Sequence, residues 1–353
     1  MTLFFIAAGL LVSWDDVDAA LRPLFEREQA GAESFDRFVQ RIETGTAQRL
    51  REGLADHLVY YVLQSRSFTE AAPIVPALSA KLYHESAMVP DNVRRRIADF
   101  TAGVHGAPRA KLLAAQLPAN GKAAFLESNY KRAMEFLHEK EFASRTRSGR
   151  DRRDYVASLY TARGHSTDTS PNSSQAAIVE LEALAAREPG VRFRRVLIVG
   201  PGLDLAPRDN LQEDVPPQSY QPATIAKALV AAGLATVGEL AVECADINPL
   251  VAQAVRADPW NILTRRPPPA RYDLVIATNV LLYFPRAELL LAINNIHQMV
   301  KPGGYFLHND TRGEIEEFTA PIRFGPVNAR MVRTGQRAGV ELYDAAVLHR
   351  REK

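Results

Sequence analysis

The chain has 353 residues, of which 24% are charged and 46% apolar, and its formal net charge is +2. This is the composition of a globular chain long enough for two domains, and it excludes a disordered, collagen-like or coiled-coil protein. The near-neutral charge gives no overall nucleic-acid footprint, so no nucleic-acid partner is expected. Cys244 is the single cysteine, which excludes an intrachain disulfide and a cysteine-rich zinc site.

One apolar run, Leu3 to Val12, stands near the start of the chain. It is too short to cross a bilayer, which requires about 20 apolar residues. It also lacks the basic residue before it and the small-residue cleavage site after it that mark a signal peptide. We therefore expect a buried first helix or strand rather than a signal remnant, and a cytoplasmic protein without a membrane span.

Residues 14–142 place apolar side chains at spacings typical of helices, with prolines between the periodic segments. The histidines of this part do not show the H-x-x-x-H spacing of a metal site, so no metal is predicted. The arginine-rich stretch 143–153 has the composition of a solvated linker or hinge. These observations predict a helical domain over 1–145 and a linker with a capping segment over 146–190.

From residue 191 the pattern changes to short β-branched runs that alternate with helical segments. The expected strands are 194–200, 239–247, 272–280 and 303–310, and the expected helices between them are 222–234, 249–257 and 287–300. Such alternation predicts an α/β domain with a doubly wound, mainly parallel, Rossmann-like sheet over 191–353. Residues 340–351 can add a last strand at the edge of the sheet.

A glycine turn, Gly200-Pro201-Gly202, follows the first of these strands. Glycine lets the chain turn sharply and lets a ligand approach bare backbone. The turn alone is a weak signal, because the third glycine of the dinucleotide fingerprint and the G-K-[ST] of a P-loop are both absent.

Asp246 ends the second expected strand, just before Asn248-Pro249 opens a helix. A carboxylate at this strand tip can accept both hydroxyls of a ribose. It can equally cap the following helix, and the two roles are compatible.

The block 272–310 contains a strand, a polar tip at Thr278-Asn279, a helix, and then Lys301-Pro302-Gly303-Gly304 leading into another strand. With the glycine turn and Asp246 before it, this order resembles the class I S-adenosylmethionine-dependent methyltransferases. The segments TNVLLYF and KPGGYF are most similar to the chemotaxis-receptor glutamate methyltransferase type. The resemblance covers roughly residues 160–310.

The resemblance implies S-adenosyl-L-methionine as cofactor and a role for each matching residue. Gly200 and Gly202 would pass beneath its amino-acid part, Asp246 would bind its ribose, and Asn279 would lie near the methyl group. Tyr283 would line the substrate mouth. The residues expected to bind the cofactor are Gly200, Pro201, Gly202, Asp204, Asp246, Ile247, Asn279, Val280, Tyr220 and Arg163.

The chain departs from the family pattern in three places. Ile198 stands where an acidic residue is common, and Asp204 replaces the third glycine, where it could hold the cofactor's ammonium. The loop after the glycine turn extends to Pro222 and is far longer than the ~2–6 residues usual for such connections. We expect it to close over the cofactor with Tyr220 facing the cleft; a tolerated surface insertion is the alternative.

Two further segments are candidates for the site. Residues 164–169 could fold over the cofactor, with Arg163 pairing with its carboxylate, or could simply form a loop before a helix. Asp258 and Asn261 are the candidates for the adenine pocket.

After the last expected strand come His308, Asp310 and Arg312. An imidazole or carboxylate at this place can act as general base on an acceptor hydroxyl or amine. Surface polar residues after a strand are the alternative interpretation. We predict His308, Asp310 and Tyr283 as the catalytic candidates.

The function that these patterns favour is methyl transfer from S-adenosylmethionine to a small-molecule or protein acceptor, without a metal. A cofactor-binding module without catalysis is the alternative, and a nicotinamide-dependent oxidoreductase is less favoured by the incomplete fingerprint. The acceptor and the oligomeric state are not indicated by the sequence.

Overall fold

The computed structural model describes residues 10–163, 171–204, 218–255, 257–337 and 340–353. The chain forms two compact units. The first, here the sheet unit, comprises Met1–Thr46, Thr169–Gly202 and Ser219–Lys353, and the second, the helical unit, comprises Ala47–Asp168 and Leu203–Gln218. Residues 10–46 and 171–190 thus group with the sheet, which differs from the predicted boundaries.

The sheet unit is built on a seven-stranded sheet in the order β3-β2-β1-β4-β5-β7-β6. The strands are β1 Arg195–Val199, β2 Ala241–Asp246, β3 Asp258–Pro259, β4 Tyr272–Ala277, β5 Val300–His308, β6 Phe324–Arg337 and β7 Val340–Arg351. β3, β2, β1, β4 and β5 pair in parallel, and β7 is antiparallel to both of its neighbours. The predicted doubly wound, mainly parallel fold is confirmed.

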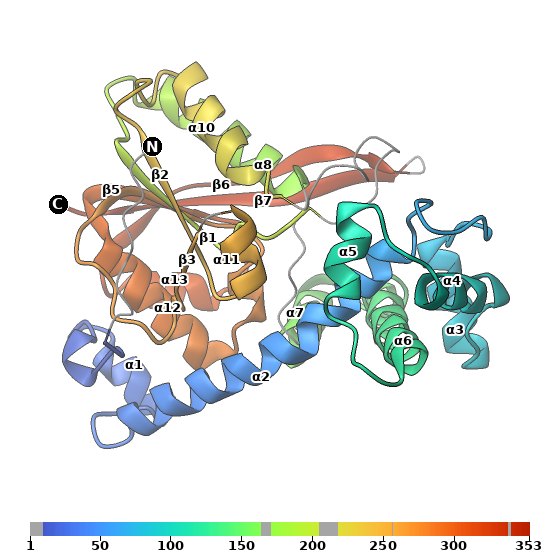
Figure 1. The fold of residues 1–353 in the computed structure, drawn as a ribbon. Helices are drawn as coiled ribbons and strands as arrows, with labels where there is room; N and C mark the ends of the chain where they lie inside the picture. The colour runs from blue at the N-terminus through green and yellow to red at the C-terminus, as the bar shows by residue number, and fades with distance from the viewer. Residues whose placement is uncertain (1–9, 164–170, 205–217, 256, 338–339) are drawn as a thin grey trace. The chain divides into compact units, whose positions relative to one another are not determined.

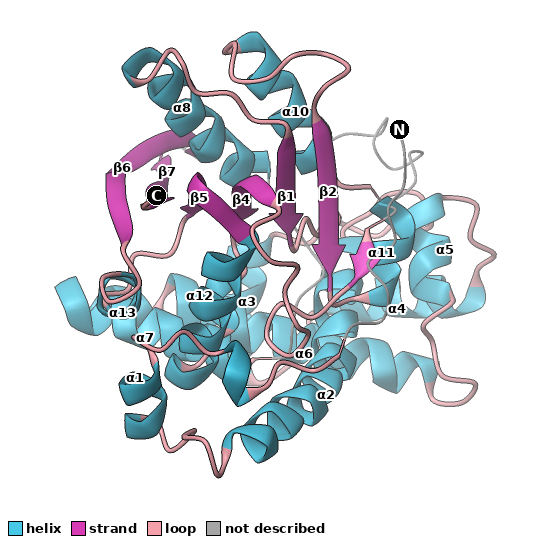
Figure 2. Ribbon diagram, turned by 90° about the vertical axis from the view of Figure 1, so that its left-hand side faces the viewer, coloured by secondary structure: helices cyan, strands magenta, loops and turns pink. Residues whose placement is uncertain are grey.

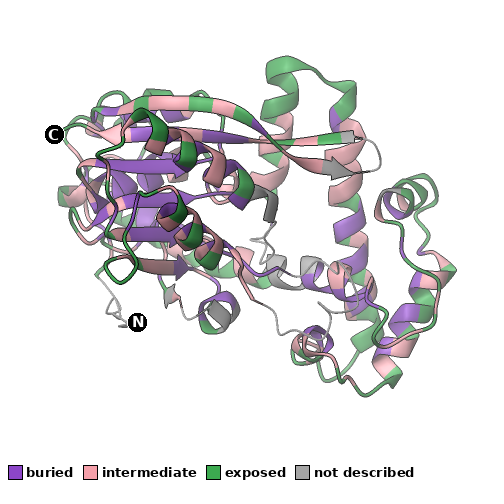
Figure 3. Cartoon of the chain, turned by 90° about the horizontal axis from the view of Figure 1, so that it is seen from above, coloured by how far each residue is buried: buried purple, intermediate pink, exposed green. Residues whose placement is uncertain are grey.

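Two apolar cores, one on each face, hold this sheet (Figure 3). Along β1, Leu197 and Val199 belong to one core while Val196 and Ile198 belong to the other. Successive side chains of a strand point to opposite faces, so a strand buried on both sides must be a continuous apolar run. That is why Val196–Val199 could be recognised as a central strand.

Helices cover both faces of the sheet (Figure 2). α8 (Pro171–Arg187) and α10 (Gln221–Ala231) pack together over one core, and α12 (Arg286–Met299) and α13 (Glu314–Thr319) cover the other. The short α11 (Pro249–Val255) follows β2 and contacts β2 and β3. α10, α11 and α12 match the predicted segments to within a few residues, whereas α13 was not predicted.

The beginning of the chain joins the sheet unit through α12. The 3-10 helix η1 (Trp14–Asp16) and α1 (Arg22–Arg27) lie beside α12 (Figure 1), and the buried Asn294 of α12 accepts a hydrogen bond from Asp18 N–H at 2.9 Å. Of the apolar run at the chain start, Leu10 is exposed, Val12 is buried, and residues 1–9 lie outside the described residues.

The sequence prediction was wrong about the edge of the sheet. β7 lies between β5 and β6 and is not an edge strand, and the edge strand β6 was not predicted at all. β6 contains Pro326 and Gly335 and has two register irregularities. A strand with one open edge and bulges does not require the continuous apolar run that identifies a central strand.

The helical unit consists of helices with short connections. They are the later part of α2 (Phe35–Val62), α3 (Pro76–Ser86), α4 (Asp91–Ala102), α5 (Pro108–Ala114), α6 (Lys122–Glu141), η2 (Ala143–Thr146) and α7 (Gly149–Ala162). The arginine-rich stretch predicted as a linker therefore forms η2 and the start of α7. Among the described residues, no helix combines the length and apolar character needed to cross a membrane.

Arg96 of α4 organises the connection between α2 and α3. Its buried guanidinium donates hydrogen bonds to the carbonyls of Leu63 and Ser65 at 2.8 Å, of Ala71 at 2.6 Å and, through Nε, of Ala72 at 2.9 Å. The fork of guanidinium donors thus satisfies backbone acceptors that would otherwise be buried without partners.

Replacing Arg96 should therefore loosen the helical unit. We expect Arg96→Met to reduce its stability by ~3 kcal/mol, because several carbonyls lose their donor at once. Thermal unfolding and amide exchange over residues 63–72 measure the effect. Arg95→Met is the matched control, since the exposed Arg95 forms only a surface ion pair with Asp99 and its loss should change stability by less than ~0.5 kcal/mol. Equal effects of the two substitutions would contradict the role given to Arg96.

Candidate functional site

The strand order reverses between β1 and β4, and in open α/β sheets ligands bind at the carboxyl edge beside such a reversal. The segments that leave the sheet at this edge are Gly200–Gly202 after β1, Asp246–Asn248 after β2, Thr278–Val280 after β4 and Asn309–Asp310 after β5. The topology thus brings together most of the site residues predicted in the sheet unit.

The glycine turn requires glycine for two reasons at Gly200. Its φ is 62°, in the left-handed region, and a Cβ built there would lie 2.5 Å from Cγ2 of Val280. Its N–H donates to the carbonyl of Ala245 in β2 at 2.8 Å, which fixes the turn against the neighbouring strand. Gly202 also has a φ of 62°, and Pro201 between them is buried. The turn therefore lies directly against Val280.

Asp246 is the buried carboxylate of this edge, with 7% of its surface exposed. Its Oδ1 accepts the N–H of Asn248 at 2.8 Å, and the N–H of Gly202 also bonds to the carboxyl group. Burial raises the pKa of Asp246 to about 7, against the opposing effect of these two donors. Asp246 thus links the glycine turn to the start of α11, and the half-buried Ile247 follows it.

A second polar group joins β4, β5 and β7. Asn279, with φ 58°, forms two hydrogen bonds with Asn309. The N–H of Asn279 donates to Asn309 Oδ1, and Asn279 Oδ1 accepts from Asn309 Nδ2, both at 2.8 Å. Asn309 Nδ2 also lies 3.2 Å from both carboxylate oxygens of Asp344. Asn309 and Asp344 were not predicted, because Asp344 is far along the chain in a strand thought to be peripheral.

The two tyrosines of the prediction are both half-buried. Tyr283 ends the 3-10 helix η3 (Leu281–Tyr283), and Tyr220 precedes α10, where its carbonyl accepts from Thr224 Oγ1 at 2.7 Å. Next to Tyr220, Gln221 donates to Thr278 Oγ1 at 2.6 Å. The loop residues 205–217 lie outside the described residues, so the closing loop and the orientation of Tyr220 toward a cleft stay predictions.

The candidate bases have structural partners. His308 is enclosed at 1% exposure, its Nδ1 accepts the N–H of Asp310 at 3.2 Å, and burial keeps the pKa of its imidazole well below the usual range. Asp310 forms a two-pronged ion pair with Arg312, which also donates to the carbonyls of Phe284 and Leu281. This geometry favours a structural role for both, fixing η3 against the end of β5.

Arg163 belongs to the helical unit. Its buried guanidinium pairs with Asp56 at 2.5 Å and lies 4.1 Å from the ring centroid of Phe136. Asp204 also groups with the helical unit, is fully buried, and its N–H donates to the carbonyl of Gln218 at 2.9 Å. The adjoining segment 164–170 lies outside the described residues.

The candidates for the adenine pocket lie beside β3. Asn261 is bonded to Glu43 of α2 at 3.4 Å and caps the N–H of Leu263 at 3.0 Å, while Asp258 begins β3. Asn261 is thus already used in joining α2 to the sheet unit.

No family model matches the chain, and no curated protein does. Solved structures similar to half of it include the N-methyltransferase NodS from Bradyrhizobium japonicum with S-adenosylhomocysteine (15% identity, 51% of this chain and 88% of that one, TM-score 0.34). They also include magnesium protoporphyrin IX methyltransferase from Synechocystis with bound SAM (12% identity, 51% of this chain and 80% of that one, TM-score 0.35). A third is the 1,6-didemethyltoxoflavin-N1-methyltransferase from Burkholderia thailandensis (17% identity, 50% of this chain and 79% of that one, TM-score 0.33). The fold class itself rests on the strand order and register described above.

The contact between Gly200 and Val280 can be tested by substitution. Gly200→Ala should destabilise the protein by ~2–5 kcal/mol, because a left-handed φ and an overpacked Cβ act together. Gly233→Ala is the control: its φ is 70° but nothing lies within 4 Å of the added Cβ, so only ~1–2 kcal/mol is expected. Val280→Ala introduced into Gly200→Ala should restore part of the loss in chemical denaturation, and a purely additive double variant would refute the clash.

The raised pKa of Asp246 predicts a pH-dependent stability. Its folded pKa of about 7 exceeds the unfolded value of 3.8, so the folded state holds the proton more tightly, and stability contributed by the protonated form is lost as pH rises from about 4 to 7. Asp246→Asn lacks this titration. We expect the variant to match the parent protein near pH 4 and to be more stable by ~4 kcal/mol at pH 8, where the parent protein has lost this contribution. Unfolding curves of the two proteins that run parallel across this pH range would contradict the shift.

Proposed function

We propose that the chain binds S-adenosylmethionine at the carboxyl edge of β1, β2 and β4 and transfers its methyl group to an acceptor. The observation that carries the proposal is the buried carboxylate of Asp246 beside the glycine turn, hydrogen-bonded to Gly202. A carboxylate offers about four lone-pair positions, and the N–H groups of Gly202 and Asn248 use two. Two positions are left for the two hydroxyls of a ribose.

The glycine turn and the tip of β4 would hold the methionine part. Gly200 presents no side chain because Val280 occupies that space, so the turn backbone and Val280 together border the place where the resemblance puts the amino-acid group. Asn279 stands beside this turn at the carboxyl end of β4 and is held by Asn309. Bound S-adenosylmethionine supplies a methyl group on a positively charged sulfur, open to direct displacement by an acceptor lone pair.

The protein's part in such a transfer is alignment of the acceptor and exclusion of water. We place Asp344, on β7 with its carboxylate 3.2 Å from Asn309 Nδ2, on the acceptor side. Its carboxylate can attract an amine or accept the proton that an acceptor hydroxyl or amine gives up. It is more exposed than the enclosed His308. The acceptor, a small molecule or a protein, is not identified.

A binding module without catalysis is the second candidate. Ile198 and Asp204 stand where the family pattern has an acidic residue and a glycine, and those departures favour it. Asp344→Asn separates the two: for an enzyme it should leave cofactor affinity within about twofold and reduce turnover with a methyl acceptor, whereas for a binder no acceptor is methylated.

Binding of S-adenosylhomocysteine tests the proposal. At a hundredfold excess over its Kd the ligand should stabilise the sheet unit by ~2.7 kcal/mol in thermal unfolding, and NAD should not. Affinity measured by calorimetry should rise with pH up to about 7, because ribose hydroxyls donate to the ionised form of Asp246. Asp246→Asn should weaken binding at least tenfold, about 1.4 kcal/mol, and remove the pH dependence. Stabilisation by NAD alone would overturn the proposal.

A further inference from the structure

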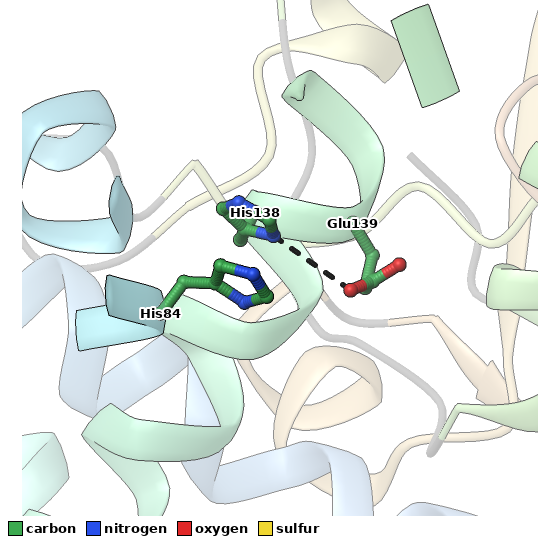
Figure 4. Close-up of side chains that lie close together, drawn as sticks. All are labelled: His84, His138 and Glu139. Atoms are coloured by element: carbon green, nitrogen blue, oxygen red, sulfur yellow. Dashed lines mark ion pairs between the residues drawn. The ribbon is translucent and has the colours of Figure 1, made fainter. Parts of the chain in front are cut away.

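Two histidines that are far apart in the sequence meet in the helical unit. His84 lies in the last turn of α3 and His138 in the last turn of α6, and these helices pack against each other. Their imidazole rings are stacked, with centroids 3.6 Å apart and planes inclined by 9° (Figure 4). The absence of an H-x-x-x-H spacing within one helix therefore did not exclude a site, because this pair comes from two helices.

Glu139 completes a set of three possible ligands. Its Oε1 lies 3.7 Å from His138 Nδ1, beyond hydrogen-bond distance, and one ligand atom from each of His84, His138 and Glu139 can be chosen within 4.8 Å of the others. The other carboxylate oxygen, Oε2, accepts the hydroxyl of Tyr155 on α7. The carboxylate is thus oriented from behind, with one oxygen directed at the histidines.

The site also contains an unsatisfied polar atom. His138 Nδ1 is buried and has no hydrogen-bond partner among the described residues, and the adjacent carboxylate is too distant to accept a proton from it. A buried polar atom without a partner costs ~1–3 kcal/mol, and a ligand that bonds to it removes that cost. The neighbours offer a second imidazole and a carboxylate, which are donors of electron pairs to a cation.

We propose that His84, His138 and Glu139 bind a divalent cation of the zinc type. Imidazole nitrogen and carboxylate oxygen are common zinc ligands, and three of them leave a fourth tetrahedral position for water. Ligand atoms around tetrahedral zinc lie ~3.4 Å apart, so the group has to contract. His84 is exposed at the end of its helix and can turn its ring out of the stack to do so.

The cation would act as a clasp between α3 and α6. Tyr155, bonded to Glu139, is the outer-sphere partner that fixes the orientation of the ligating carboxylate. Because the clasp forms only when both helices are folded, metal binding should stabilise the helical unit. It needs no participation of the site at the sheet edge.

Full-length protein freed of metal with a chelator and then titrated with zinc chloride tests this assignment. We expect one equivalent bound by calorimetry, a rise of the melting temperature that magnesium chloride does not give, and, with cobalt(II) in place of zinc, the visible absorption of a tetrahedral complex. His84→Ala should weaken zinc binding at least tenfold while leaving the metal-free melting temperature unchanged, because the side chain is exposed.

Glu139→Gln should also weaken binding, and Glu85→Gln is its matched control. Glu85 is an exposed carboxylate next to His84 on α3, paired with Lys81 and outside the cluster. Zinc affinity that is the same in His84→Ala as in the parent protein, or no zinc binding at all, would overturn the proposal. An equal loss in Glu85→Gln and Glu139→Gln would overturn the assignment of Glu139.

Discussion

Burial of β1 and β4 on both faces is the constraint on which the sheet unit depends. Side chains of these strands alternate between two cores, so a one-residue shift of register would exchange one core for the other along the whole strand. With the register fixed, the strands end at defined residues, and the polar groups that follow them are held at one edge. The position of Asp246 and Asn279 is therefore a consequence of apolar packing several residues earlier.

At that edge the backbone of the glycine turn, and not only its side chains, shapes the candidate site. Gly200 has no room for a Cβ, and the N–H of Gly202 is directed at the carboxyl group of Asp246. Burial raises the pKa of Asp246 to about 7 despite its two backbone donors, so the group exists in both protonated and ionised forms near neutrality. The ligand part that suits Asp246 is a pair of uncharged hydroxyl groups, which complete its hydrogen bonding.

The sequence was informative where one segment determines its own environment. The apolar runs of β1 and β4 and the glycine turn could be identified because burial on both faces and a left-handed φ restrict the residue types locally. β6, exposed along one edge and interrupted by Pro326, carries no such signature. Pairings across long separations were also missed: Arg163 meets Asp56 107 residues away, and His84 meets His138 through packing of two helices. No spacing rule within one element can reveal such contacts.

The hairpin of β6 and β7 extends beyond the rest of the sheet. β5 pairs with β7 only from Val347 to Arg350, whereas β6 accompanies β7 as far as Val340. Residues 340–346 thus belong to a two-stranded ribbon with a single hydrogen-bonded neighbour, and such ribbons twist strongly and are the least stable form of sheet. Local opening should therefore begin in the ribbon and stop where β5 joins it. Asp344 lies on the opening side of that boundary, so an acceptor bound there, as proposed, would also reduce how often the ribbon opens.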